Sequence, residues 1–146
     1  MDKNTDSFWI NYLSILAILV LLFGISMAVV PLVWRDIFNF LVFADNDFPQ
    51  SFSVEAINYI RLTLSIAGAV MAGWMLVILQ IIRGPLKSGE KWAWNATFYS
   101  LALWFIIDSS YSLYLGFPEN ALLNSGIFLA FLMGLLKVRP KGIIKT

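Results

Sequence analysis

Cysteine and histidine are absent from the 146 residues, and charged residues make up only 13% of them. Without cysteine the chain has no disulfide bonds, no thiol nucleophile and no thiol redox centre. Without histidine it lacks the imidazole base of many acid–base catalysts and the usual ligands of zinc and copper. The sequence therefore predicts no metal site, no cofactor and no enzymatic activity.

What the chain has in excess is apolar residues, which make up 60% of the sequence and give a mean hydropathy of +0.78. Both values favour a membrane protein over a soluble one. The charges cluster between four apolar runs, so each run can lie in lipid while the charges stay at the surfaces. We expect an all-α polytopic membrane protein, a single domain over residues 1–146 that forms an antiparallel bundle of four transmembrane helices. The expected helices cover about residues 8–34, 54–82, 92–115 and 120–137.

The first apolar run is too long for a signal peptide, so we interpret it as an uncleaved transmembrane helix. Pro31 lies near its end and predicts a kink or a stop. Residues 35–50 are too short and too interrupted to span. Their first half suits either an amphipathic interfacial segment or an apolar loop packed over the bundle. Asp45 and Asp47 have the spacing of a calcium loop, but the glycine and the distal glutamate are missing, which favours a solvated turn.

Small residues recur at helical spacing on the first two expected helices, and such residues mark close helix contacts in lipid. On the first helix they are Ala17, Gly24 and Ala28. On the second helix Gly68 and Ala72 share a face with Arg61 and Ser65. We therefore expect Arg61 to face the bundle rather than the acyl chains.

The fourth expected helix carries a strict stripe of small residues, Gly126, Ala130 and Gly134, at four-residue steps. Such a stripe either seats the helix within its own bundle or forms a dimer interface. We favour the internal use and keep a homo-oligomer as the alternative.

The orientation follows from the distribution of lysine and arginine, which accumulate on the cytoplasmic side of membrane proteins. Of the ten, eight fall in the N-terminal segment, the loop between the second and third helices, and the tail. Only Arg35 and Arg61 fall on the opposite side, which also carries five acidic residues. The sequence predicts a multi-pass protein of the cell inner membrane with both termini in the cytoplasm.

Asp108 lies inside the third expected helix, where an ionised carboxylate costs on the order of 2.5 to 3.5 kcal/mol unless it finds a partner. Arg61 is seven residues from the outer start of its helix, and Asp108 is eight residues from Gly116. At 1.5 Å per residue both lie about 10 to 12 Å below the outer surface. Equal depth predicts that Arg61 and Asp108 pair.

Polar and aromatic residues accompany the two charges. Trp104 and Tyr111 lie on the helix of Asp108, and Ser65 lies one turn from Arg61. One hypothesis is a ligand, ion or proton site that opens outward, since ionisable groups within a membrane are usually functional. The other is a structural ion pair that fixes helix register.

The segment Gly-Glu-Lys-Trp-Ala-Trp at residues 89–94, with its flanking helices and Asp108, resembles stretches of uncharacterised small four-helix membrane proteins of bacteria. The resemblance covers the second and third helices, about half of the chain. It implies a four-helix membrane fold and no particular activity. Small multidrug transporters carry a carboxylate in their first helix, and residues 8–34 contain none.

Three functions follow, in order of preference. The first is a structural or partner-binding bundle, the partner being the bilayer and another membrane protein or a second copy. The second is a binder or carrier of a lipid or a small apolar or amphipathic ligand, in an outward-facing pocket near Arg61 and Asp108. The third is a dimeric small transporter, which would need further intramembrane titratable groups. We expect no nucleic-acid partner.

Overall fold

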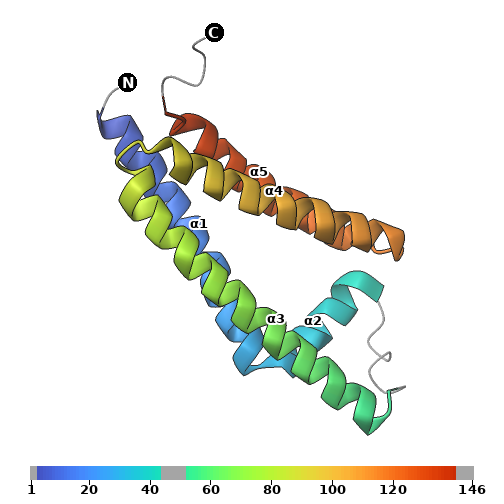
Figure 1. Cartoon of the computed structure of the whole chain (residues 1–146). Helices are drawn as coiled ribbons and strands as arrows, with labels where there is room; N and C mark the ends of the chain where they lie inside the picture. Colours follow the sequence, from blue (N-terminus) through green and yellow to red (C-terminus); the bar gives the residue numbers. More distant parts are fainter. Residues whose placement is uncertain (1–2, 44–51, 141–146) are drawn as a thin grey trace. The chain divides into compact units, whose positions relative to one another are not determined.

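The computed structural model describes residues 3–43 and 52–140, and these residues contain helices and turns but no strand. The helices are α1 (Lys3–Val29), α2 (Pro31–Phe43), α3 (Val54–Ile81), η2 (Ile82–Leu86), α4 (Lys91–Tyr114) and α5 (Pro118–Lys137), shown in Figure 1. The chain divides into two compact units, residues 1–18 with 77–146 (unit 1) and residues 19–76 (unit 2). Each unit is described by itself.

The first helix stops just before Pro31, as predicted there, and so ends earlier than the expected residue 34; Pro31 also begins a new helix. α1 stops at Val29, and α2 starts at Pro31, where the missing N–H of proline removes no helical hydrogen bond. The ring of Trp34 packs edge-on against Phe23 at 4.6 Å between centroids. Its indole N–H donates to the Ser26 hydroxyl at 2.9 Å, so α2 is fixed to the end of α1.

α2 covers the first half of the segment for which a headgroup-level helix and an apolar loop were both possible. It is helical, and it exposes Ile37 and Phe40 while it buries Asn39. Its exposed surface combines these apolar side chains with Asp36, which is typical of an amphipathic helix. The predicted turn at Asp45 and Asp47 lies outside the described residues.

In unit 2 the backbones of α1 and α3 touch where two glycines face each other. A Cβ atom on Gly24 would lie 2.7 Å from the backbone oxygen of Gly68, and one on Gly68 would lie 2.5 Å from that of Gly24. Ala72 and Ala28, four residues further along each helix, complete the contact through their backbone nitrogens. Both helices thus present a small-xxx-small pattern, which permits close approach in a membrane.

The second apolar run extends beyond its expected end, because Gly84 and Pro85 widen the helix instead of stopping it. α3 continues into the π-helix η2, and the Lys87 N–H bonds the carbonyl of Ile82, five residues back, at 3.2 Å. The wider turn accommodates Pro85, which has no N–H to donate. Ile82 and Leu86 are buried and fix this turn in unit 1.

The C-terminal half of unit 1 is an antiparallel hairpin of α4 and α5, which run side by side in Figure 1. The turn contains Gly116 in the left-handed region, at φ 84°, a conformation that glycine adopts without strain. The Trp94 indole donates to the carbonyl of Leu135 at 2.8 Å, and Phe105 stacks on Phe128 at 4.7 Å. The two helices therefore stay in contact over most of their length.

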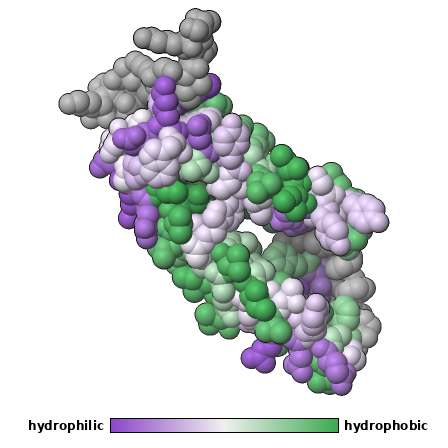
Figure 2. Space-filling model, viewed as in Figure 1, coloured by the Kyte–Doolittle hydropathy of each residue, from purple (hydrophilic) through white to green (hydrophobic). Residues whose placement is uncertain are grey.

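Three of the helical segments in the described part of the chain are long and apolar enough to cross a membrane: Ser7–Val29, Val54–Leu86 and Pro118–Lys137. Figure 2 shows hydrophobic residues along the helices and hydrophilic ones mainly near their ends. α4 has the length of a span but is not among the three, because Asp108 and several serine, threonine and asparagine residues lower its hydropathy. The chain is thus an all-helical protein with three candidate spans, and the four-span bundle remains a proposal.

Candidate polar site in the α4–α5 hairpin

Asp108 is the centre of a hydrogen-bonded network between α4 and α5. The Asn120 amide donates to the Asp108 carboxylate at 3.0 Å and to the Ser112 hydroxyl at 2.7 Å. The Ser112 hydroxyl donates to the backbone carbonyl of Asp108 at 2.7 Å, and a carboxylate oxygen of Asp108 lies 3.3 Å away. One amide from α5 therefore orients the carboxylate and its neighbouring hydroxyl on α4.

The local fold explains this meeting. Asp108 and Ser112 are four residues apart, so they lie on the same face of α4. The tight turn at Gly116 brings the first turn of α5, with Asn120, back against that face. Tertiary proximity here is a consequence of a short hairpin connection between two antiparallel helices.

Two further polar side chains on these helices, Ser109 of α4 and Asn124 of α5, are buried without a partner among the described residues. Ser109 is 7% exposed and Asn124 is 4% exposed. The Ser109 hydroxyl and the Asn124 amide nitrogen have no hydrogen-bond partner in the described part of the chain. An unsatisfied buried polar group costs about 1 to 3 kcal/mol. Each of these two donors could therefore form a hydrogen bond with an added acceptor.

The arrangement has a limited chemical repertoire. A half-buried carboxylate can bind a cation or a proton, and the free donors of Ser109 and Asn124 can bind a water, hydroxyl or carbonyl oxygen. In the described residues of unit 1, the basic side chains lie on η2, the first turn of α4 and the end of α5, away from the turn at Gly116. The Ser112 hydroxyl lies 3.3 Å from the Asp108 carboxylate, but it donates to the Asp108 backbone carbonyl at 2.7 Å and accepts from Asn120. The site is suited to binding.

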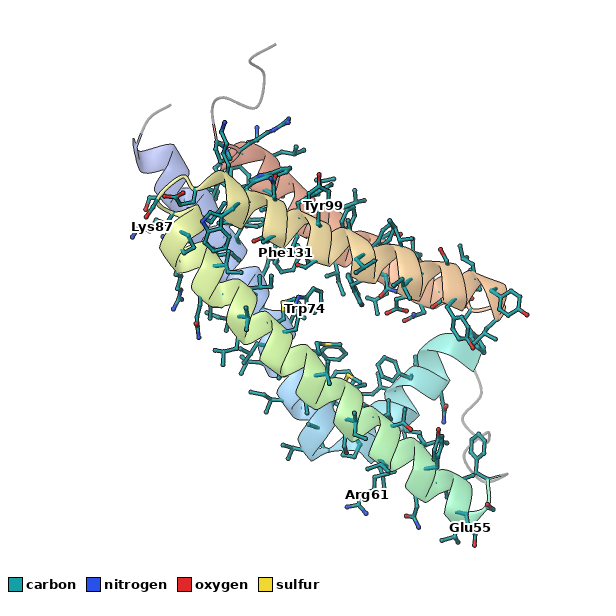
Figure 3. The ribbon with its side chains drawn as sticks, in the orientation of Figure 1. Glu55, Arg61, Trp74, Lys87, Tyr99 and Phe131 are labelled. Carbon is teal, nitrogen blue, oxygen red and sulfur yellow. The ribbon has the colours of Figure 1, made fainter. Side chains whose placement is uncertain are left out.

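The remaining predicted site residues are distributed over both units. Tyr111 is exposed, with its ring 6.2 Å from that of Tyr114, and Trp104 is half-buried on α4. Arg61 is exposed and Ser65 is half-buried, both on α3 in unit 2 (Figure 3). Because Asp108 belongs to unit 1, its pairing with Arg61 stays a prediction. The ion pair recorded among the described side chains joins Arg35 to Asp36 at 2.6 Å.

The predicted packing residues have separate neighbours. Gly68 and Ala72 meet α1 as described above. Gly134 meets Leu13, whose side chain lies 2.6 Å from a Cβ built there, and the Ala130 carbonyl accepts a hydrogen bond from Tyr12 at 3.2 Å. A Cβ built on Gly126 meets no atom within 4 Å. The stripe on α5 therefore contacts α1 at one end and leaves Gly126 uncovered at the other.

Sequence reasoning missed Asn120, Ser109 and Asn124. Asn120 and Asn124 are four residues apart and hence share one face of α5. In an antiparallel hairpin with a three-residue turn, that face meets the last turns of α4. The four-residue spacing of Asn120 and Asn124 was visible in the sequence. Its meaning depends on how α4 and α5 are aligned, which the periodicity of a single helix does not give.

No protein family, curated protein or solved structure matches this chain. Its function has to be argued from the residues and their geometry.

Proposed function

We propose that the chain is a four-span protein of the inner membrane that binds a partner within the bilayer and catalyses no reaction. The observation that carries the proposal is the distribution of polar residues on α4. Among its buried polar side chains Ser112 bonds Asn120 of α5, while its exposed surface carries hydroxyl and amide groups among apolar side chains. A helix that hides some polar groups and exposes others in lipid needs a further neighbour to cover the exposed ones.

The packing of α4 supports its role as a fourth span. α5 is a candidate span, and α4 runs antiparallel to it from the Trp94–Leu135 contact to the Asp108–Asn120 contact. Thr97 is fully buried and bonds the carbonyl of Ala93 at 2.8 Å. Such internal bonds remove much of the penalty for polar groups in hydrocarbon, and a hydropathy scale does not include them.

Contacts at the helix ends support termini on the same side. The Lys137 ammonium lies 5.9 Å from the centre of the Trp9 ring, so the end of α5 lies beside the start of α1. An even number of spans produces this arrangement. The excess of basic residues in the N-terminal segment, the central loop and the tail favours the cytoplasm as that side.

Reporter insertions test the four-span topology. We expect a periplasmic reporter to be active when it is inserted at Gly116 and inactive when it is inserted at Ser88 or after the C-terminus. A cytoplasmic reporter should give the opposite pattern. The same side for Gly116 and Ser88 would mean that α4 does not cross, and the proposed topology would be wrong.

The exposed face of α4 supports partner binding. Tyr99, labelled in Figure 3, is 65% exposed in the interior of α4. Asn95 and Ser110 of the same helix are also exposed. The exposed face of α5 carries Leu122, Leu129 and Leu136, whereas that of α4 mixes apolar side chains such as Leu103 and Ile107 with these polar groups. α5 is therefore suited to lipid, whereas a protein surface with hydrogen-bonding groups would complement α4.

Site-specific photocrosslinking in native membranes tests this difference. A photoreactive residue at Tyr99 should give a discrete crosslinked protein, whereas the same residue at Leu129 should give lipid adducts only. The mass of the product distinguishes another membrane protein from a second copy of the chain. Lipid adducts alone at Tyr99 would contradict partner binding.

A second candidate function is the binding of a small amphipathic ligand at Asp108. The specific observation is the pair of buried, unpartnered groups, the Ser109 hydroxyl and the Asn124 amide nitrogen. A ligand hydroxyl could accept a hydrogen bond from one of these two donors and donate its own hydrogen to the Asp108 carboxylate. The apolar part of such a ligand would lie in the surrounding lipid.

Native mass spectrometry tests this candidate. The wild-type chain should carry a bound small molecule that Asn124→Leu loses, because leucine removes the donor and fills its space. Asn95→Leu, on the exposed face of α4, is the matched control and should retain the ligand. An identical mass pattern in all three proteins would exclude a ligand at Asn124.

A further inference from the structure

Unit 1 separates its charges between the two ends of the α4–α5 hairpin. Five basic residues lie at the end opposite to the turn: Arg83, Lys87, Lys91, Lys137 and Arg139. Glu90 is the acidic residue on the same segments, and the first turns of α1 add Lys3 and Asp6, whose charges are opposite. Asp108 and Glu119 lie toward the turn. The basic end therefore carries a concentrated positive field in the described part of this unit.

Two of these cations are held over tryptophan rings. The Arg139 guanidinium carbon lies 5.5 Å from the centre of the Trp94 ring, and the Lys137 ammonium lies 5.9 Å from that of Trp9. Trp94 is itself fixed, because its indole N–H bonds the Leu135 carbonyl at 2.8 Å and its ring stacks on Phe98. A cation over a fixed aromatic face is restrained without losing its charge.

Both cations remain accessible. Arg139 and Lys137 are exposed, and neither has a carboxylate partner among the described side chains. With one face against the Trp94 ring, the planar guanidinium still has its N–H edges free for two parallel bonds to a phosphate. The lysine adds a second positive charge from the last turn of α5.

Apolar surface continues directly from these cations along α5. Met133 and Leu136 are exposed within the last turns of the helix, and Leu129 is exposed further along it. Trp92 is exposed at the start of α4. A free phosphate ion would use only the cations. A phospholipid would place its phosphate at Lys137 and Arg139 and its acyl chains along the apolar face.

From this arrangement we infer that the basic end of unit 1 is a binding site for the phosphate group of an anionic phospholipid, with Arg139 and Lys137 as its principal ligands. The cytoplasmic leaflet, where the proposed topology places this end, is the leaflet with the anionic surface charge. The site does not require a partner on α4, so it can exist whether or not partner binding is correct.

Thermal unfolding of delipidated protein in a neutral detergent tests the inference. The probes are phosphatidylglycerol, phosphatidylcholine and inorganic phosphate. We expect phosphatidylglycerol to raise the melting temperature more than phosphatidylcholine does, and inorganic phosphate to have no effect. Native mass spectrometry should show retention of one or two phosphatidylglycerol molecules by the wild-type chain.

The matched variants separate a specific site from general attraction by positive charge. The double variant Lys137→Gln/Arg139→Gln should lose the difference between the two lipids. Arg83→Gln/Lys87→Gln removes the same charge at the same end, but from residues without a recorded aromatic contact, and should keep the difference. Arg139→Lys should retain part of it, because the charge stays while the planar fork is lost.

Two outcomes would overturn the inference. Equal losses in both double variants would show that the lipid responds to net charge alone. An equal response of the wild type to both lipids would show that no anionic site exists. The melting temperature of each variant in phosphatidylcholine reports its folding, and mass spectrometry measures lipid retention directly, so a merely unstable variant is recognised.

Discussion

At the scale of single residues, the chain shows how a carboxylate can be kept in an apolar helix. Asp108 is held by Asn120 and Ser112, so part of its lost hydration is replaced by protein donors. Sequence reasoning found Asp108, because a charge inside a long apolar run is conspicuous. It did not find Asn120, because an amide near a helix start is common and acquires its role only through the hairpin register.

Asn120→Ala should destabilise the protein by about 1.5 to 3 kcal/mol, the usual value of a hydrogen bond to a charged group. The substitution removes the donor of both the 3.0 Å bond to Asp108 and the 2.7 Å bond to Ser112. If these donors alone, and not Arg61, stabilise the carboxylate, Asp108→Asn should cost less than Asn120→Ala, because its amide oxygen can still accept from Asn120 while the buried charge disappears. Chemical unfolding in detergent measures both values.

The control for this pair is Asn95→Ala, which removes an exposed amide from the same helix bundle. Its effect should stay within about 0.5 kcal/mol, as for most surface substitutions. If Asn120→Ala were as mild as the control, the network would contribute little to stability and Asp108 would need another source of stabilisation.

At the scale of helices, periodicity predicted the apolar segments well but not how they end. Pro31 was expected to kink or stop the first helix, and it does stop it, but it also starts α2. Gly84 and Pro85 were expected to stop the second helix, yet the chain passes through them as a π-helix. The first prediction is confirmed and the second is wrong, because neighbouring backbone can accommodate the hydrogen bond that a proline lacks in more than one way.

The α1–α3 crossing gives a sharp prediction at a single methyl group. Gly68→Ala places a Cβ 2.5 Å from the Gly24 oxygen and 2.7 Å from the Ala28 nitrogen, and these backbone atoms cannot rotate away. We expect a loss of about 1 to 3 kcal/mol as the helices separate. Gly73→Ala lies on the same helix and meets no atom within 4 Å. It should be neutral or stabilising by up to about 1 kcal/mol, through helix propensity alone.

Melting temperatures of the two alanine variants, measured side by side in one detergent, check this difference. Similar melting temperatures would mean that Gly24 and Gly68 are not in contact in the folded protein.

The stripe on α5 makes a second comparison between neighbouring glycines. Gly134→Leu must displace Leu13 and Tyr12 of α1, whereas Gly126→Leu projects into open space. We expect the first variant to lower the melting temperature and the second to leave it unchanged in the monomer. Size-exclusion chromatography with light scattering should be run on both. A smaller oligomer for Gly126→Leu with an intact fold would assign the uncovered end of the stripe to a dimer interface.

At the scale of the whole molecule, the sequence predicted the all-helical class and the long helices, three of which are candidate membrane spans, because composition and run length determine them. It could not supply the packing between helices, which depends on side-chain register, nor the arrangement of the two units. The pairing of Arg61 with Asp108 would be a contact between the two units, and the sequence indicates only that the two residues have similar depths. Arg61 lies about 10 Å from the start of α3, and Asp108 about 9 Å from the end of α4, at 1.5 Å per residue. With the proposed topology both distances are measured from the same side of the membrane.

The pairing of Arg61 with Asp108 therefore remains a prediction that thermodynamics can decide. If the two charges form one unit, Arg61→Gln or Asp108→Asn alone leaves an unpaired charge and should cost about 3 to 5 kcal/mol, as for buried ion pairs. The double substitution should recover much of that loss, since neither charge remains. A double-mutant cycle on unfolding in detergent measures the coupling. The alternative is that Arg61 is not needed, because Asn120 and Ser112 already form hydrogen bonds with the carboxylate. Strict additivity of the two substitutions would show that these polar neighbours, and not Arg61, stabilise the Asp108 carboxylate.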